Sequence, residues 1–165
     1  MKKQRNIILY IGTSIDGYIA NDDGTLEWLE STDSSKELTL LLWEKELMMS
    51  FVFDRNYPYC DFKNYVFSKS VSGSDEYASF IVEDVKTFIK KIIQKPGKDI
   101  WLIGGGNLAR KFFKENLIVE FQLAIAPIIF GKGISLYIGD DSTVNFKLTK
   151  VQKLGQLAML HYIKK

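Results

Sequence analysis

Hydrophobic positions along the chain form short continuous runs in some places and a helical period in others. The run from Asn6 to Ile11 is almost wholly apolar and ends at Gly12. Such a run is typical of a strand that is buried on both faces of a largely parallel sheet. The turn-forming residues from Thr13 to Thr25 then predict a loop at the carboxyl end of this strand. Because α/β proteins bind ligands at that end of their strands, this loop is a candidate binding segment.

The middle of the chain alternates short strands with amphipathic helices. The first of these helices carries apolar residues at helical spacing with lysines opposite, and Pro96-Gly97 ends it. The predicted elements are, in order, a strand at Asn64 to Ser68, a strand at Phe80 to Val82, a helix at Glu83 to Gln94, a strand at Asp99 to Ile103 and a helix at Asn107 to Asn116. This alternation predicts an α/β sheet.

The last part of the chain predicts strands only. Glu120 to Phe130 is the next strand and ends at the turn formed by Gly131, Lys132 and Gly133. Phe146 to Leu154 and Leu157 to Tyr162 flank Gly155-Gln156, and two residues suffice to link the strands of an antiparallel hairpin. With 165 residues, of which 46% are hydrophobic, we expect one domain over residues 1–165.

Charge and composition narrow the classes of function. The 22 basic and 20 acidic residues leave a net charge of +2, so neither nucleic acid nor membrane is an expected partner. Cys60 and His161 are the only residues of their kinds, which excludes an internal disulfide and paired-histidine zinc motifs, and we expect no metal. The apolar run that follows Met1 to Arg5 is too short for a signal peptide or a spanning helix, so a cytoplasmic protein is expected.

The three consecutive glycines Gly104, Gly105 and Gly106 are the strongest local signal for a ligand. They follow a predicted strand and open a predicted helix, where free amides and the helix dipole favour phosphate. Together with Ala109 they satisfy a weak dinucleotide-binding pattern, but so late in the chain that an ordinary Rossmann domain is disfavoured. The alternative is a tight strand-to-helix turn without a ligand.

Asp16 and Trp28 are candidates for contact with a substrate. Asp16 is a candidate proton donor or substrate anchor if its loop closes over the ligand. The alternative is an aspartate that shapes the turn before Gly17, because Asp-Gly is a common turn pair. Trp28 either covers a substrate or packs in the core, which is the commoner role of a large aromatic residue.

Considered together, five separated motifs are more specific than any one of them. They are Ser14-Ile15-Asp16-Gly17-Tyr18-Ile19-Ala20, Asp23-Gly24-Thr25-Leu26-Glu27-Trp28-Leu29, Tyr65-Val66-Phe67-Ser68, Gly104-Gly105-Gly106-Asn107-Leu108 and Pro127-Ile128-Ile129-Phe130-Gly131-Lys132-Gly133. In this order they resemble the RibD C-terminal domain family, which is dihydrofolate-reductase-like. The resemblance implies a three-layer α/β/α fold with a central, mostly parallel sheet and a C-terminal antiparallel hairpin.

The same resemblance implies an activity and a site. The activity is hydride transfer from NADPH to a small pterin-like or pyrimidine-like substrate, similar to 5-amino-6-(5-phosphoribosylamino)uracil reductase or dihydrofolate reductase, in a protein that forms homodimers. Thr13 and Ile19 would border the nicotinamide, and Asp16 and Trp28 the substrate. Ser68 would lie near the adenosine half of the cofactor. The residues that would hold the pyrophosphate are Gly104, Gly105, Gly106, Asn107 and Leu108.

One family motif is missing from the chain. The family has a buried strand followed by glycine, a basic residue, any residue, threonine and tyrosine, and the helix that begins there binds cofactor phosphates. The segment from Lys36 to Met49 takes its place here. Because Glu37 to Met49 has helical composition, we expect the sheet to lack that strand. The alternative function is therefore a nucleotide-binding or structural relative without turnover.

The sequence of the replaced segment can also be explained by a change of reading frame in the gene. Tryptophan and methionine each have a single codon, so Lys36 to Met49 back-translates with little freedom. Shifting the reading frame by two bases permits the string I-D-T-I-I-M-G-K-R-T-Y-D, which contains the missing motif. We hypothesise a compensated pair of frame changes, with the family frame resuming near Phe53, which intact-mass measurement and resequencing would decide.

Overall fold

The structure, a computed structural model, describes residues 5–22, 24, 40–44, 62–137 and 143–165. Its helices are α2 (Val85–Ile93) and α3 (Gly106–Lys114). Its strands are β1 (Ile7–Thr13), β2 (Tyr18–Ala20), β3 (Leu40–Glu44), β4 (Lys63–Phe67), β5 (Gly73–Ser74), β6 (Ala78–Ile81), β7 (Ile100–Leu102), β8 (Glu120–Ile125), β9 (Ile134–Ser135), β10 (Phe146–Leu154) and β11 (Leu157–Lys164).

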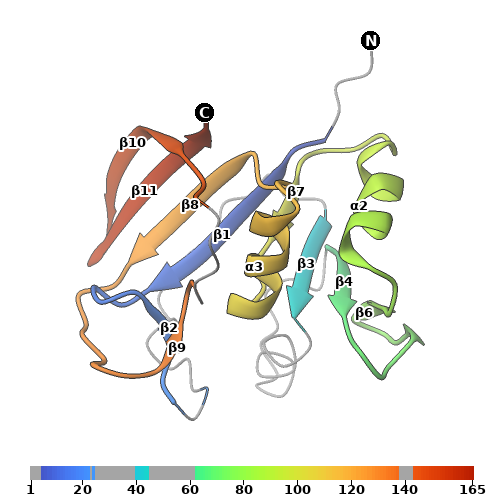
Figure 1. Ribbon diagram of the computed structural model, residues 1–165, viewed down its shortest axis with the longest axis horizontal. Coiled ribbons are helices and arrows are strands. Elements are labelled where there is room, and N and C mark those ends of the chain that lie inside the picture. Colours follow the sequence, from blue (N-terminus) through green and yellow to red (C-terminus); the bar gives the residue numbers. More distant parts are fainter. Residues whose placement is uncertain (1–4, 23, 25–39, 45–61, 138–142) are drawn as a thin grey trace.

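Strand β1 lies in the middle of a nine-stranded sheet, as its apolar run predicts. The strand order is β10-β11-β8-β1-β7-β3-β4-β6-β5 (Figure 1). Every pair of neighbouring strands between β8 and β6 in this order is parallel. In β1, for example, Leu9 lies opposite Leu102 of β7 on one side and opposite Phe121 of β8 on the other. The hairpin of β10 and β11 adds to β8 in antiparallel orientation. The mixed α/β class, the mostly parallel sheet and the C-terminal hairpin are thus confirmed.

Both described helices pack on the same face of the sheet (Figure 1). Asp84 caps α2 by accepting a hydrogen bond from the N–H of Thr87 at 3.1 Å, and lysines occupy the last turn. The buried residues that the helices contribute to the core are Val85, Phe88, Ile89, Ile92, Leu108, Ala109, Phe112 and Phe113. The three-layer prediction also includes helices on the opposite face; no described helix packs there, and this part of the prediction concerns residues outside the described ranges.

The expectation that the sheet lacks a strand between Lys36 and Met49 is wrong. Strand β3 lies between β7 and β4 and pairs in parallel with both, with Leu42 opposite Leu102 on one side and Tyr65 on the other. All five residues of β3 pair with β4, and Leu41 and Leu42 pair with β7 as well, which provides hydrogen-bond partners for the strand backbone. This tertiary context outweighs the local helical composition on which the expectation depended.

Two predicted boundaries also differ from the structure. Strand β8 ends at Ile125 instead of Phe130. The N–H of Ala126 makes the last hydrogen bond to β1, to the carbonyl of Thr13 at 2.8 Å, and the next residue, Pro127, has no N–H to donate. The predicted loop from Thr13 to Thr25 contains β2, which pairs with β9 in a separate two-stranded sheet. The loop is therefore partly ordered by a segment that lies more than a hundred residues further along the chain.

Candidate functional site

The candidate site lies along the carboxyl edge of the parallel strands. Strand β1 ends at Thr13, β4 ends beside Ser68, and β7 is followed by Gly104. The arrowheads of β1, β3 and β4 point toward the same edge in Figure 1. The sequence prediction that these residues border one site is thus compatible with the strand directions, since ligands of open α/β sheets bind beyond the carboxyl ends of the strands.

Among the described residues, no side chain caps the start of α3. Gly105 is the N-cap residue, with φ −65° and ψ 179°, and makes no side-chain capping hydrogen bond, whereas α2 is capped by Asp84. The first-turn N–H groups of a helix have no acceptor within the helix. Since the helix dipole adds partial positive charge, Gly106, Asn107 and Leu108 can offer their amides to an anion.

Gly106 brings the start of α3 against the loop that follows β1. A Cβ atom at Gly106 would lie 2.8 Å from the carbonyl oxygen of Ser135 and 3.5 Å from Cδ1 of Ile19. Ser135 is in β9 and pairs with Tyr18 of β2. The structure therefore places Ile19 beside the glycine turn, and only glycine leaves room for this approach.

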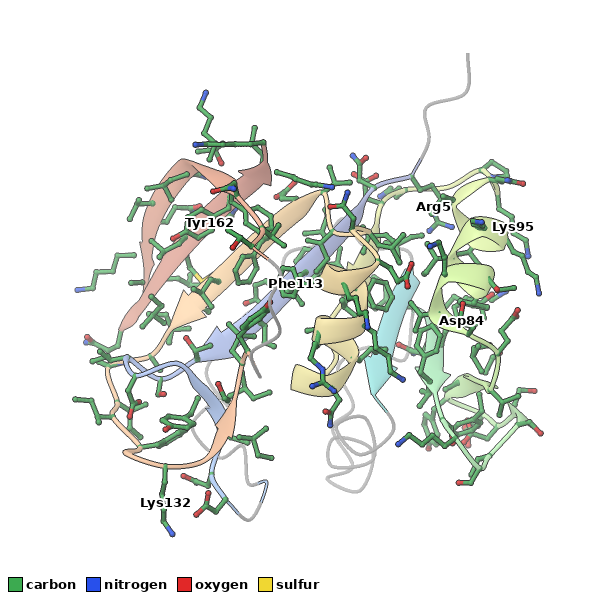
Figure 2. All side chains as sticks on the ribbon, viewed as in Figure 1. Arg5, Asp84, Lys95, Phe113, Lys132 and Tyr162 are labelled. Atoms are coloured by element: carbon green, nitrogen blue, oxygen red, sulfur yellow. The ribbon has the colours of Figure 1, made fainter. Side chains whose placement is uncertain are left out.

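Asp16 binds the turn that precedes β9. Its Oδ1 and Oδ2 accept hydrogen bonds from the N–H of Phe130 at 3.2 Å and of Gly131 at 2.8 Å (the turn itself lies near labelled Lys132 in Figure 2). The hydroxyl of Ser14 donates to the same carboxylate, and the Ser14 oxygen accepts from the N–H of Tyr18 at 2.9 Å. Ser14 is 1% exposed, so this hydroxyl is a buried link between β1 and the carboxylate.

These donors also determine the protonation state of Asp16. The hydroxyl of Ser14, followed by the amides of Gly131 and Phe130, lowers the pKa of the Asp16 carboxyl below its ordinary value. At neutral pH the group is a carboxylate, which accepts hydrogen bonds and has no proton to donate. Of its two candidate roles, this favours the substrate anchor over the proton donor.

Replacing Asp16 by asparagine tests this arrangement through the pH dependence of stability. Because the folded-state pKa lies below the unfolded value, the carboxylate stabilises the fold above about pH 4 and this contribution is lost as the pH falls through the folded pKa. We expect the wild type to have a higher Tm than Asp16→Asn at neutral pH, with the gap closing in acid. A gap that stays constant in thermal denaturation down to about pH 2 would contradict the assignment.

Thr13 and Ser68 lie at different places along the edge. Thr13 is 2% exposed, and its carbonyl accepts the Ala126 amide. The oxygen of Ser68 accepts hydrogen bonds from the N–H groups of Ser70 and Val71, the latter at 3.0 Å. Strands β7 and β3 separate β1 from β4, so Ser68 is roughly 14 Å from the end of β1 at ordinary strand spacing. An extended ligand is needed to reach both, and Trp28 lies outside the described residues.

The sequence did not single out Ser14 or Ser135 as positioning residues. Ser14 belongs to the loop motif, but its partner is the carboxylate of Asp16. That carboxylate binds Phe130 and Gly131, which lie 114 and 115 residues further along the chain than Asp16. No local pattern signals such a contact. The close approach of Ser135 to Gly106 has no sequence signal except the glycine itself.

The described residues contain neither a cluster of possible metal ligands nor a helix that could span a membrane. Among those residues, no three histidine, cysteine, aspartate or glutamate side chains are close enough to hold a metal ion. Neither α2 nor α3 is long and apolar enough to cross a membrane. Cys60 lies outside the described residues.

The order of motifs and the geometry of the carboxyl edge agree with a family match. Residues 62–160 match the RibD C-terminal domain. The chain belongs to the RibD C-terminal domain family. Two Bacillus subtilis members, YwjB and YyaP, are 31% and 29% identical to this chain, over 98% and 91% of its length and 99% and 89% of their own. The family resemblance inferred from the five motifs is confirmed.

Solved structures confirm the RibD-type, dihydrofolate-reductase-like fold. A Shewanella sp. PV-4 protein attributed to riboflavin biosynthesis has a TM-score of 0.81 at 26% identity, with 97% of this chain and 99% of that one covered. The Thermotoga maritima diaminohydroxyphosphoribosylaminopyrimidine deaminase/5-amino-6-(5-phosphoribosylamino)uracil reductase has a TM-score of 0.72 at 14% identity. This chain covers 57% of the Thermotoga protein, whose likeness concerns the fold alone.

Proposed function

We propose that this chain is an NADPH-dependent reductase that transfers hydride to a small heterocyclic substrate of the pterin or pyrimidine type. The family, which is the reductase domain of RibD, supports the class of reaction. The observation that carries the proposal is the uncapped start of α3 at the carboxyl edge of the sheet, with Ile19 beside it. An anion-binding helix start next to a loop that can border a ring is the arrangement that a dinucleotide requires.

The described residues fit NADPH at three points. The amides of Gly106, Asn107 and Leu108 would bind the pyrophosphate, while the Leu108 side chain stays in the core at 3% exposure. The cofactor supplies the hydride. Ile19, 8% exposed, offers an apolar edge for a ring, and the hydroxyl of Ser68 can still donate to the distant half of the cofactor because its own oxygen accepts local N–H groups.

Asp16 would hold the substrate as a hydrogen-bond acceptor. The N–H groups of Phe130, Gly131 and Asp16 itself and the hydroxyl of Ser14 all donate to this carboxylate. A ring N–H or an amino group of the substrate would bind by sharing an oxygen with one of these donors or by displacing it. Ile15 and Ile129 are exposed at 60% and 68%, so apolar surface is available beside the carboxylate for the face of a heterocycle.

Titration with NADPH, followed by substrate tests, examines the proposal. We expect NADPH to bind, as measured by its fluorescence, and the nicotinamide absorbance to fall when a suitable pyrimidine or pterin is added. Failure to bind NADPH would overturn the placement of the cofactor. NADH in a parallel titration tests the preference for the phosphorylated cofactor.

A relative without turnover is the second candidate, because the glycine, basic residue, threonine and tyrosine motif is absent between Lys36 and Met49. Strand β3 occupies part of this segment, and the rest lies outside the described residues. In this case NADPH or another nucleotide binds and no substrate of either class is consumed. Binding and turnover measured on the same preparation therefore separate the two functions.

We also propose that the chain forms a homodimer through β10. This strand is the edge of the sheet, and Leu148 and Val151 expose 49% and 61% of their surface on one face of it. An unpaired edge with exposed apolar side chains favours association. Light scattering is expected to show a dimer for the wild type, a monomer for Val151→Asp, and a dimer for Gln152→Asp on the opposite face. A monomeric wild type would refute this interface.

A further inference from the structure

A hollow of about 240 Å³ lies at the amino edge of the sheet, opposite the candidate cofactor site. Arg5 precedes β1, Lys63 begins β4, and Lys95 follows α2. All three line the hollow above Tyr65 and Ile92. Figure 2 shows Arg5 and Lys95 at this end of the molecule, near the end of α2. Three basic residues therefore line one concave surface that takes no part in the proposed reductase site.

The guanidinium of Arg5 is held in a fixed position. Arg5 is 8% exposed, and its Nε donates to the carbonyl of Lys98. Gly97, with φ +154°, allows this approach, because a Cβ atom there would lie 3.1 Å from the Arg5 Cζ. A guanidinium has five N–H donors, and the Nε bond is its one hydrogen bond to the described residues. The side chain is thus ordered with donors to spare.

Within the described residues, no carboxylate forms an ion pair with the three cations. The charge of Asp99 interacts electrostatically with Arg5. The Asp99 carboxylate, however, accepts a hydrogen bond from the N–H of Asn6 at 2.8 Å and forms no ion pair with Arg5. Burial lowers the pKa of Arg5, against the opposing effects of Asp99 and Tyr65. Since arginine stays protonated in proteins, a buried cation remains that an anion would stabilise.

Lys63 and Tyr65 complete the hollow from β4. The Nζ of Lys63 lies 5.3 Å from the centroid of the Tyr65 ring, a cation–π distance. The ring packs edge-on against Phe88 with centroids 4.9 Å apart, which fixes its orientation. Tyr65 is 8% exposed and lines the hollow, so its phenol adds a hydrogen-bonding group beside the cations.

The size of the hollow selects the kind of ligand. It is smaller than the roughly 300–1,000 Å³ of pockets that bury whole drug-sized molecules, yet far larger than one water molecule requires. Its charged lining is formed by two lysines and an arginine, the usual partners of phosphate. A compact, highly charged anion fits both properties.

We propose that this hollow binds a compact oxyanion, either inorganic phosphate or the terminal phosphate of a small phosphomonoester, through Arg5, Lys63 and Lys95. The site is independent of the proposed reductase function, because it lies at the other end of the strands. A ligand there would contact β1, β4 and the connection from α2 to β7, and would stabilise the fold by binding only the native state.

Calorimetric titration with inorganic phosphate and with a pentose monophosphate, at constant ionic strength with chloride as the reference anion, tests the proposal. The test variant is Lys63→Gln/Lys95→Gln, and the control is Lys90→Gln/Lys111→Gln, which removes the same charge from exposed positions of α2 and α3. We expect saturable binding to the wild type and the control, weakened roughly tenfold for each hollow lysine removed. Preserving Arg5 avoids a buried substitution that threatens folding.

The relative affinities for the two anions show whether the hollow binds free phosphate or a phosphomonoester. Tighter binding of the pentose monophosphate identifies a phosphomonoester site, and equal binding identifies a site for free phosphate. The proposal is overturned if the wild type shows no saturable binding, or if test and control variants bind equally. It is also overturned if phosphate binding survives in the lysine variant and is lost in Gly106→Ala, because the ion would then bind at α3.

Discussion

Replacing Gly106 by alanine is expected to weaken NADPH binding by at least roughly tenfold. The new Cβ would lie 2.8 Å from the carbonyl oxygen of Ser135, so α3 and β9 must move apart. That shift displaces the first-turn amides and separates them from Ile19, the apolar edge beside them. We expect an additional loss of about 1–3 kcal/mol in the free energy of unfolding, the usual cost of overpacking. Fluorescence titration and chemical denaturation measure the two effects.

Lys111→Ala is the matched control, because it truncates an exposed side chain on the same helix without touching β9. Its NADPH affinity and stability should stay near those of the wild type. Titration at a temperature at which both variants are folded by circular dichroism separates binding from unfolding. An unchanged affinity in folded Gly106→Ala would mean that the cofactor is not held at the start of α3.

Replacing Gly133 by alanine is expected to cause the largest loss of stability. A Cβ at this position would lie 2.3 Å from the carbonyl oxygen of Ala20, and the backbone has φ +152°, a conformation that residues other than glycine rarely adopt. Strain and collision together should cost more than about 3 kcal/mol, or roughly 10 °C in Tm for a protein of this size. Thermal and chemical denaturation measure the effect.

Gly131→Ala separates the two causes within the same turn. Gly131 also has positive φ, at +72°, but a Cβ there meets nothing within 4 Å. Its cost should be about 1–2 kcal/mol from the backbone alone. If Gly133→Ala and Gly131→Ala lowered the free energy of unfolding equally, the backbone of Gly133 would be further from the Ala20 carbonyl than in this structure.

The elements that local pattern dictates were predicted from the sequence. The apolar run of β1 and the helical spacing of α2 with its Pro96-Gly97 stop are properties of adjacent residues, and both elements form where expected. Strand β3 was not predicted, because its pairing with β7 and β4 depends on residues far along the chain. Local composition alone pointed to a helix.

For the candidate site, too, some features could be predicted from the sequence and others could not. The glycine turn before α3 is visible in the sequence, because consecutive glycines between a strand and a helix have few structural reasons to occur. The engagement of Asp16 by the Phe130 and Gly131 amides is invisible there, since it joins segments more than a hundred residues apart. The Asp16 carboxylate binds the distant turn at Phe130 and Gly131, whereas the alternative interpretation concerned the local turn before Gly17.

The attachment of the β1–β2 loop to the segment before β9 has a consequence for protein engineering. Asp16 binds the Phe130–Gly131 backbone, Lys132 pairs with Asp22 at 2.8 Å, and β2 pairs with β9. Each of these contacts has one partner in each segment, so grafting either segment alone from a relative would put all of them at risk. A chimera that exchanges this part of the carboxyl edge must therefore transfer residues 13–22 and 126–135 as one unit.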